Sequence, residues 1–288
     1  MFYADAAEVL PNDIWRIDTH QVSYIQPDSG SFTKLRYYRF ADNRWQQTDA
    51  DAFYQMQDNN VPLVVFAPGY SSATQQTTNT GLGIVRILDK HKPQTSVRYR
   101  IVFWDWYADQ TTCRIRSDVR SKIPVAKRAG TYLTLFLQSL KPDSKVCLFG
   151  FSFGARIVCR SVQSLPDDAA AKLHLHVVLS GAAVDQHWLG DNSLYGDVVK
   201  RAEKVLVTYT SDDWALKFYP YMYEPGTEAE ALGLLGVPMK QILPQCRDRI
   251  ESIDIRRYIG RDHQTLKHAG SLPFRERIDE YFFFGSNR

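Results

Sequence analysis

The chain reads KVCLFGFSFGARIVCR over residues 145–160. Its first five residues predict a short apolar strand, and the residues after Gly154 predict an amphipathic helix. Between them lies a Gly-x-Ser-x-Gly motif centred on Ser152, in the strand–turn–helix order that exposes a serine hydroxyl on a sharp, strained turn. Gly150 and Gly154 leave room for that turn, and the start of the helix places backbone N–H groups beside the serine. Ser152 is therefore the first candidate for a nucleophile, against the simpler interpretation of an ordinary strand–helix turn.

The composition is that of a single globular domain. The chain has 288 residues, of which 44% are hydrophobic, and this is ample for one large core. The formal net charge is +3, and Lys and Arg are spread along the chain without a run, so we expect no nucleic-acid partner. We expect neither a signal peptide nor an integral membrane segment, because no apolar stretch is long enough to span a bilayer. The cysteines show no metal-binding spacing, and Cys147 and Cys159 are expected to be buried in a reduced, cytoplasmic protein.

Apolar runs of strand length alternate with periodic, helix-length segments from about residue 61 onward. The expected strands cover residues 61–66, 98–104, 145–149, 174–180, 204–210 and 251–255. The expected helices cover residues 79–91, 118–140, 153–164, 193–203 and 273–284, with Pro124 near the first turn of the second. Strands that are apolar on both faces and separated by helices predict an α/β fold, with a mostly parallel central sheet and helices on both faces. Residues 14–22 and 34–40 alternate in polarity, which predicts antiparallel strands at the N-terminal edge of one domain spanning 1–288.

Ligands of open α/β sheets bind beyond the carboxyl ends of the strands. The residues that follow the expected strands are therefore the candidates for a site: Pro68–Ser72, Asp105, Ser152, Asp185, Asp212, Asp213 and those after residue 255. Asp105 is expected to stabilise its loop. His174 and His176 share one face of a strand, but no third ligand accompanies them, so we interpret them as strand residues rather than a metal pair.

These residues resemble the α/β-hydrolase superfamily over roughly residue 60 to the C-terminus. The resemblance rests on GFSFG at 150–154, SDDWAL at 211–216 and GRDH at 260–263, which place Ser, Asp and His in the family's order. The chain looks most like esterase- or lipase-like bacterial members that carry a similar SFGARI elbow and a D-x-x-L-K-x-Y-P segment. The resemblance implies the fold and a serine hydrolase activity, and it leaves the substrate open.

The resemblance assigns a base and an acid to the candidate nucleophile. His263, in the loop after the last strand, is the expected base, because an imidazole can take the serine proton and return it to a leaving group. Its rival is His268, which we expect on the following helix, facing solvent. Asp213 is the expected acid, since it matches the family's x-x-Leu pattern, and Asp212 and Asp185 remain alternatives in that order.

An oxyanion hole needs two backbone N–H donors aimed at the developing negative charge. Phe153, which follows the nucleophile, is the expected source of one. Tyr70 is the expected source of the other, although the family often has His-Gly where this chain has Pro68-Gly69. The long segment 214–250 is rich in Tyr, Pro, Leu and Gly, and is either a lid or cap-like insertion with an apolar acyl-binding wall, or ordinary packing over the sheet.

The first functional hypothesis is hydrolysis of a carboxylic ester through an acyl-enzyme on Ser152. An apolar acyl group is favoured because of Phe151, Phe153 and the apolar segment after Asp213, which makes a small-molecule ester or lipid-like compound the expected partner. No metal or organic cofactor is implied. The alternatives are acyl transfer, thioester or peptide cleavage with the same residues, and a catalytically silent binding protein on the same fold. The sequence does not indicate the oligomeric state.

Overall fold

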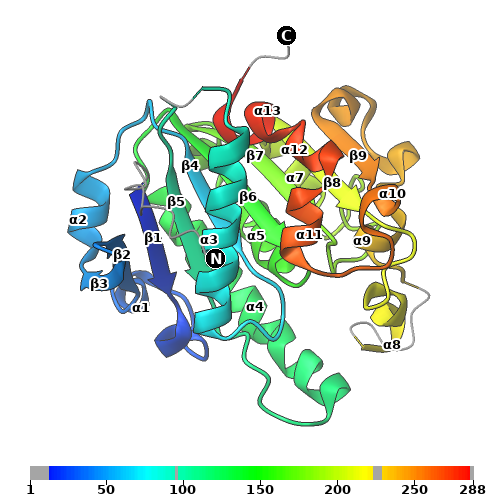
Figure 1. The fold of residues 1–288 in the computed structure, drawn as a ribbon, viewed down its shortest axis with the longest axis horizontal. Coiled ribbons are helices and arrows are strands. Elements are labelled where there is room, and N and C mark those ends of the chain that lie inside the picture. Colours follow the sequence, from blue (N-terminus) through cyan, green and yellow to red (C-terminus); the bar gives the residue numbers. More distant parts are fainter. Residues whose placement is uncertain (1–12, 95–96, 223–228, 286–288) are drawn as a thin grey trace, which may run out of the picture.

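The computed structural model describes residues 13–94, 97–222 and 229–285. Its centre is a nine-stranded sheet in the order β3-β2-β1-β5-β4-β6-β7-β8-β9 (Figure 1). The strands are β1 (Asp13–Asp18), β2 (Arg36–Ala41), β3 (Arg44–Thr48), β4 (Leu63–Ala67), β5 (Arg100–Asp105), β6 (Ser144–Phe151), β7 (Leu173–Ser180), β8 (Lys204–Tyr209) and β9 (Ile250–Asp254). The longer helices are α3 (Thr74–His91), α4 (Ile115–Gln138) and α5 (Gly154–Gln163).

The shorter helices connect the strands and close the chain. They are α1 (Ser29–Phe32), α2 (Ala50–Gln55), α6 (Asp167–Ala170), α7 (Gly196–Arg201), α8 (Tyr219–Met222), α9 (Leu232–Leu235), α10 (Arg256–Ile259), α11 (Thr265–Gly270), α12 (Leu272–Arg275) and α13 (Ile278–Phe283). In the described part of the chain, four 3-10 helices accompany them: η1 (His20–Val22), η2 (Leu216–Phe218), η3 (Met239–Gln241) and η4 (Pro244–Arg249).

The predicted fold class, a mostly parallel sheet between two layers of helices, is confirmed. Along β6, Val146 and Leu148 pack into the core that α4, α5 and α7 cover. Cys147 and Phe149 alternate with them and pack into the opposite core, under α3 and α11 to α13. Figure 1 shows α3 lying in front of the sheet. Because successive strand side chains point to opposite faces, the central strands must be apolar on both, as the sequence indicated.

The N-terminal strands differ in detail from the prediction. β2 runs antiparallel to both of its neighbours, β1 and β3. β1, predicted to be antiparallel, pairs parallel with β5 on its inner side and is antiparallel only to β2. Alternating polarity indicates a strand with one buried face, but it carries no information about the direction of the neighbouring strand.

Two helix predictions are corrected. Pro124 lies inside α4 rather than in its first turn. A proline there removes one helical N–H donor, yet α4 buries a continuous apolar face that includes Val125, Ala126 and Ala129. The segment 273–284, predicted as one helix, forms the separate helices α12 and α13.

The turn after β6 has the geometry that its two glycines were predicted to allow. Ser152 has a φ of +51°, a left-handed conformation that is unfavourable for a residue with a side chain. A Cβ on Gly154 would lie 2.0 Å from the carbonyl oxygen of Ala67 on the neighbouring strand. A Cβ on Gly150 would lie 2.8 Å from Cα of Ala155. Both glycines are therefore required for α5 to pack this closely against the sheet.

Gly154→Ala is expected to lower the free energy of unfolding by about 3 kcal/mol, because the new Cβ would overlap backbone that cannot rotate away. Gly270→Ala is the matched control, since a Cβ on Gly270 would meet nothing within 4 Å. Ala is the better helix former, so the control should be neutral or more stable by up to about 1 kcal/mol. Chemical denaturation of both variants checks this, and equal midpoints would contradict the role of Gly154.

Candidate active site

Ser152 lies at the carboxyl end of β6, in a turn fixed from both sides. Its backbone N–H donates to the carbonyl oxygen of Ser180 at 3.0 Å, and its own carbonyl oxygen accepts from the N–H of Ala183 at 3.0 Å. The residue is 6% exposed. These bonds to the neighbouring strand and the loop after it hold the strained serine in place, and such stored strain is common at functional sites.

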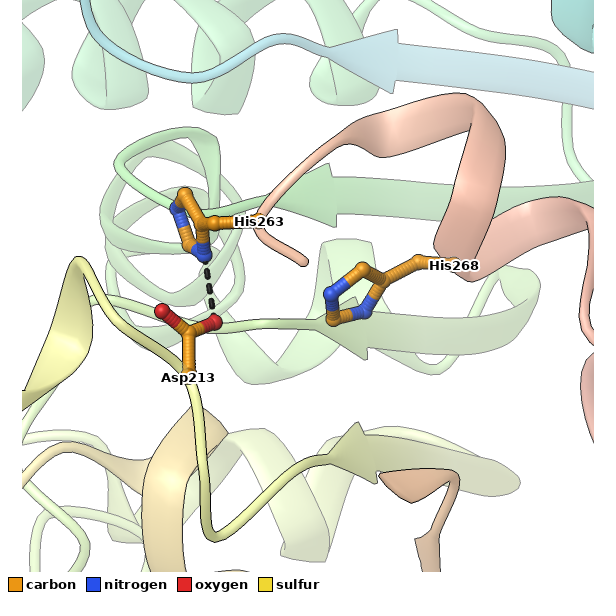
Figure 2. A group of neighbouring side chains, drawn as sticks. All are labelled: Asp213, His263 and His268. Carbon is orange, nitrogen blue, oxygen red and sulfur yellow. Dashed lines mark hydrogen bonds and ion pairs between the residues drawn. The ribbon is translucent and has the colours of Figure 1, made fainter. Parts of the chain in front are cut away.

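Ser152, His263 and Asp213 form one hydrogen-bonded chain. His263 Nε2 lies 2.8 Å from Ser152 Oγ, and His263 Nδ1 lies 2.5 Å from Asp213 Oδ2. Asp213 is fully buried, and the His263 side chain is 12% exposed. Because an ionised carboxylate can only accept, Nδ1 carries the hydrogen and Nε2 presents its lone pair to the serine hydroxyl. Figure 2 shows the Asp213 carboxylate beneath the His263 ring.

A short turn after β8 orients the Asp213 carboxylate. Its Oδ1 accepts hydrogen bonds from the backbone N–H groups of Ala215 and Leu216, each at 2.9 Å. Oδ1 is therefore occupied by main-chain donors, and Oδ2 is left to face the imidazole. The D-x-x-L pattern in the sequence corresponds to this turn.

The alternative acids lie elsewhere. Asp212 is at the surface, where Oδ1 is 3.6 Å from Lys217 Nζ and Oδ2 is 3.9 Å from Arg256 Nη1. Asp185 accepts a hydrogen bond from the backbone N–H of His187 at 2.8 Å. Of the predicted candidates, Asp213 is the one that the structure brings to His263.

His268 was predicted to face solvent, and this is wrong. Its side chain on α11 is fully buried, and its ring centroid lies 6.2 Å from that of His263. Burial, followed by the proximity of His263, lowers the pKa of His268 to about 4, although Asp213 opposes the shift. Helix periodicity did not reveal this, because the His268 ring packs against Phe151 at the end of β6 and Ser180 at the end of β7, which are far away in the sequence.

The buried His268 is expected to make the fold acid-sensitive. Its pKa is about 4 in the folded chain and about 6.5 when unfolded, so the unfolded state takes up its proton first as the pH falls. This contribution to stability is complete above about pH 6.5 and is lost on the way to pH 4, by about 3 kcal/mol between pH 7 and pH 4. Urea unfolding at both pH values checks this, with His268→Gln as the comparison. If the variant loses as much stability as the wild type, His268 is not responsible.

The expected oxyanion-hole residues flank Ser152. Phe153 follows it at the start of α5, and its ring stacks on Trp106 with centroids 5.6 Å apart. The loop after β4 approaches closely, since a Cβ on Gly69 would lie 3.1 Å from Ser152 Cβ. Tyr70, the next residue, donates its hydroxyl hydrogen to Asp118 Oδ2 at 2.8 Å, which anchors this loop to α4. The role of the two backbone N–H groups as oxyanion donors stays a prediction.

A pocket of about 270 Å³ opens beside the serine. Its lining consists of Gly69, Tyr70, Ser72, Gln76, Thr80, Phe151, Ser152, His263, Gln264, Thr265 and Leu266. Phe151 and Leu266 supply apolar surface, and uncharged hydroxyl and amide groups supply most of the rest. A second hollow, of about 240 Å³, lies at the opposite edge, where β1, β4, β5 and β6 begin, and is remote from the serine.

The segment 214–250 does not line this pocket in its described parts, residues 214–222 and 229–250. Gly233 instead donates its N–H to the carbonyl oxygen of Ala182 at 2.9 Å, which packs α9 across the ends of the central strands. Residues 223–228 lie outside the described part of the chain. A lid in this region stays a prediction.

Among the residues that the structure describes, two groups of side chains have the composition of a metal site. In the first, ligand atoms of Asp213, His263 and His268 lie within 4.8 Å of one another (Figure 2). Both nitrogens of each histidine already have hydrogen-bond partners. A cation bound here would therefore have to break the hydrogen bonds that link Ser152, His263 and Asp213.

The second group is Asp18, His20 and Asp105, at the carboxyl ends of β1 and β5. Arg16 Nε lies 3.9 Å from Asp105 Oδ2, and His20 Nε2 lies 3.3 Å from Asp105 Oδ1. The Arg16 guanidinium therefore already supplies a positive charge beside the buried Asp105 carboxylate, and His20 Nε2 lies beside its other oxygen. Asp105 also accepts the backbone N–H of Thr19 at 2.9 Å on its carbonyl oxygen, consistent with its predicted structural role.

Two further sequence expectations concern the chain as a whole. Cys147 and Cys159 are buried, as predicted. Over the described residues, the helices are too short or too polar for any of them to be a candidate membrane span. Residues 1–12, on which the expectation about a signal peptide rests, lie outside the described part.

Comparisons with known proteins give matches among solved structures alone. A scan against protein-family models gives no match, and a search of the curated proteins gives none. The chain is similar to a bacterial heroin esterase at 13% identity, over 86% of this chain and 80% of that one, with a TM-score of 0.43. It is similar to the catalytic core domain of acetyl xylan esterase from Trichoderma reesei at 14% identity, over 77% and 96%, with a TM-score of 0.41. A Trichoderma reesei cutinase in complex with a phosphonate inhibitor matches at 15% identity, over 82% and 81%, with a TM-score of 0.37.

The sheet and the elbow decide the fold class. A mostly parallel sheet carries a serine with positive φ between a central strand and its helix, followed in the chain by an aspartate and a histidine that converge on it. The fold is an α/β-hydrolase fold. This confirms the fold expected from the resemblance, whereas the likeness to a bacterial branch stays a prediction.

Proposed function

We propose that this chain is a serine hydrolase that cleaves carboxylic esters through Ser152, His263 and Asp213. The observation that carries the proposal is the unbroken chain from Ser152 Oγ to His263 Nε2, at 2.8 Å, and from His263 Nδ1 to Asp213 Oδ2, at 2.5 Å. An unassisted serine hydroxyl is a weak nucleophile, and this arrangement supplies the base that activates it.

In the first half of the reaction, Ser152 Oγ attacks the ester carbonyl carbon while His263 Nε2 takes the hydroxyl proton. The buried Asp213 carboxylate stabilises the imidazolium that forms. The carbonyl oxygen becomes an oxyanion, which the backbone N–H groups of Phe153 and Tyr70 would stabilise. When the intermediate collapses, the alkoxide leaves and takes the proton from His263, so an alcohol departs and the acyl group remains on the serine.

In the second half, water enters and His263 Nε2 removes one of its protons as the water oxygen attacks the acyl carbon. A second oxyanion forms in the same place. Its collapse breaks the bond to Ser152 Oγ, which regains a proton from His263, and the carboxylic acid leaves. The serine, histidine and aspartate return to their starting states, and no step requires a metal or an organic cofactor.

The pocket bears on which ester is cleaved. Its volume of about 270 Å³ lies just below the usual range of about 300–1,000 Å³ for small-molecule sites. We therefore favour a short apolar acyl group lying against Phe151 and Leu266, which retains the preference drawn from the sequence but limits the chain length.

Purified protein should hydrolyse p-nitrophenyl acetate or butyrate faster than p-nitrophenyl octanoate, and activity should survive treatment with EDTA. The matched p-nitroanilide tests whether the amide is cleaved more slowly than the ester. Hydrolysis of none of the esters by a folded sample would favour the alternative of a catalytically silent binding protein. A silent binding protein would be favoured by a serine that no histidine approaches. Here His263 Nε2 lies 2.8 Å from Ser152 Oγ, so the geometry does not support that alternative.

A further inference from the structure

His268 is a buried titratable residue that the proposed reaction does not use. It lies on α11, just beyond the loop that carries His263, and both of its ring nitrogens have partners. Nδ1 lies 3.0 Å from Ser180 Oγ, and Nε2 lies 3.3 Å from the carbonyl oxygen of Asp262. Asp262 is the residue immediately before His263.

The partners of His268 fix its tautomer. A carbonyl oxygen can only accept, so the hydrogen of the neutral ring is on Nε2 and points at Asp262. Nδ1 then accepts the hydroxyl hydrogen of Ser180. Because Ser180 has one hydrogen, the Thr208 hydroxyl, whose oxygen is 2.7 Å away, must donate to Ser180 Oγ. A directed chain therefore runs from Thr208 at the end of β8, through β7 and α11, to the main chain beside His263.

The loop before His263 is held at each of its carbonyl groups. Thr210 Oγ1 donates to the carbonyl oxygen of Gly260 at 2.8 Å, and the backbone N–H of Trp214 donates to that of Arg261 at 3.3 Å. His268 holds the third, Asp262, which is the nearest of them to His263. A peptide plane held at its oxygen cannot rotate freely, so this bond limits where the next Cα, that of His263, can lie.

Packing connects the two histidines as well. The Phe151 ring touches both, with centroid distances of 5.0 Å to His263 and 5.3 Å to His268. The same three rings meet around Gly181, where a Cβ would lie 3.0 Å from His268 Cε1, 3.3 Å from Phe151 Cε2 and 3.4 Å from His263 Cε1. A change in the position of the His268 ring would therefore reach His263 through side chains in direct contact.

We propose that His268 is a positioning residue for His263: through the carbonyl group of Asp262, it sets the distance between His263 Nε2 and Ser152 Oγ. The proposal rests on the proposed function. The burial of His268 has a further consequence, because it favours the neutral ring. A neutral His268 places no second positive charge beside the imidazolium that His263 becomes. A misplacement of about 1 Å between reacting groups can lower a rate about 100-fold, so one hydrogen bond here can have a large effect on catalysis.

The test compares two substitutions at this position. His268→Phe retains a planar ring but removes both hydrogen bonds, whereas His268→Gln retains one donor and one acceptor. We expect His268→Phe to lower kcat about tenfold or more with little change in KM, and His268→Gln to recover most of that loss. If His268→Phe keeps the wild-type kcat, or if the two variants are equally impaired, the proposal is overturned.

His176→Phe separates positioning from general damage to the core. His176 lies in the first half of β7 and is 4% exposed. Its Nδ1 lies 3.1 Å from the carbonyl oxygen of Tyr281 on α13. The His176→Phe variant should have a lower midpoint of thermal unfolding, as His268→Phe does, but an unchanged kcat. An equal loss of kcat in His176→Phe would mean that the effect of His268 is only structural.

Nuclear magnetic resonance tests the proposal without a substrate. The Nδ1–H proton of His263 reports its bond to Asp213, and ¹⁵N shifts report the tautomer of each ring. We expect His268 to be the Nε2–H tautomer, and the His263 Nδ1–H signal to move in His268→Phe and return in His268→Gln. An unmoved signal overturns the positioning role whether or not any ester is cleaved. Failure of the proposed function would instead appear as a wild-type protein that shows these signals but cleaves no ester.

Discussion

Ser152→Ala is expected to lower kcat for any ester that the wild type hydrolyses by about 10⁶-fold, with the fold unchanged. The reason is chemical, because the variant has no oxygen to form the acyl-enzyme, while the pocket and the oxyanion donors remain. The residual rate should come from binding and from the backbone N–H groups alone. Steady-state kinetics and circular dichroism on the same samples check this, and hydrolysis within about tenfold of the wild type would contradict it.

Ser152→Gly is the matched control for strain at the same position. It should be as inactive as Ser152→Ala, since it also lacks the hydroxyl. It should nevertheless be more stable than the alanine variant by about 1 kcal/mol, because glycine adopts the observed φ of +51° without a Cβ clash. An alanine variant as stable as the glycine variant would mean that the turn holds no strain.

Asp213→Asn is expected to lower kcat about 10⁴-fold and to change KM little. The two backbone N–H groups of Ala215 and Leu216 bind Oδ1 of the aspartate, and they require an oxygen there in the variant too. The amide NH₂ group must then point at His263 Nδ1, which lies 2.5 Å from Oδ2 in the wild type. Nδ1 becomes an acceptor, the hydrogen moves to Nε2, and the imidazole can no longer accept the serine proton.

Asp212→Asn provides the control, because it is the same change one residue earlier. Asp212 is at the surface, and its ion pairs with Lys217 and Arg256 are long and solvent-exposed. Such pairs contribute about 0–1 kcal/mol, so kcat should stay within about twofold of the wild type. Similar losses in both variants would argue against Asp213 as the partner of His263.

The core of the site could be predicted because its signals are local. The strand, the two glycines and the helix around Ser152 are contiguous in the sequence. The strand and the helix follow from their apolar patterns, and the glycines follow from the close approach of backbone that the turn requires. Asp213 also carries a local pattern, since Leu216 marks the turn whose N–H groups bind the carboxylate. The convergence of these residues follows from the parallel sheet, which places the carboxyl ends of its strands at one edge.

What could not be predicted depends on contacts between distant segments. His268 looked like an exposed helix residue because its partners come from two earlier strands. Ser180 hydrogen-bonds to His268 directly, and Thr208 hydrogen-bonds to Ser180. The direction of β1 depends on its pairing with β5, which alternation of polarity does not encode. For segment 214–250, the sequence left open an acyl-binding wall or ordinary packing over the sheet, and its described parts do not line the pocket.

The most direct test of the central claim is covalent labelling of the purified protein with a fluorophosphonate. Attack of an activated Ser152 Oγ on phosphorus displaces fluoride and leaves a stable adduct, which mass spectrometry of the digested protein locates. The geometry predicts stoichiometric labelling of the peptide that contains Ser152, none in Ser152→Ala and much slower labelling in Asp213→Asn. A folded wild-type protein that is not labelled, or an adduct that persists at another residue in Ser152→Ala, would contradict the account.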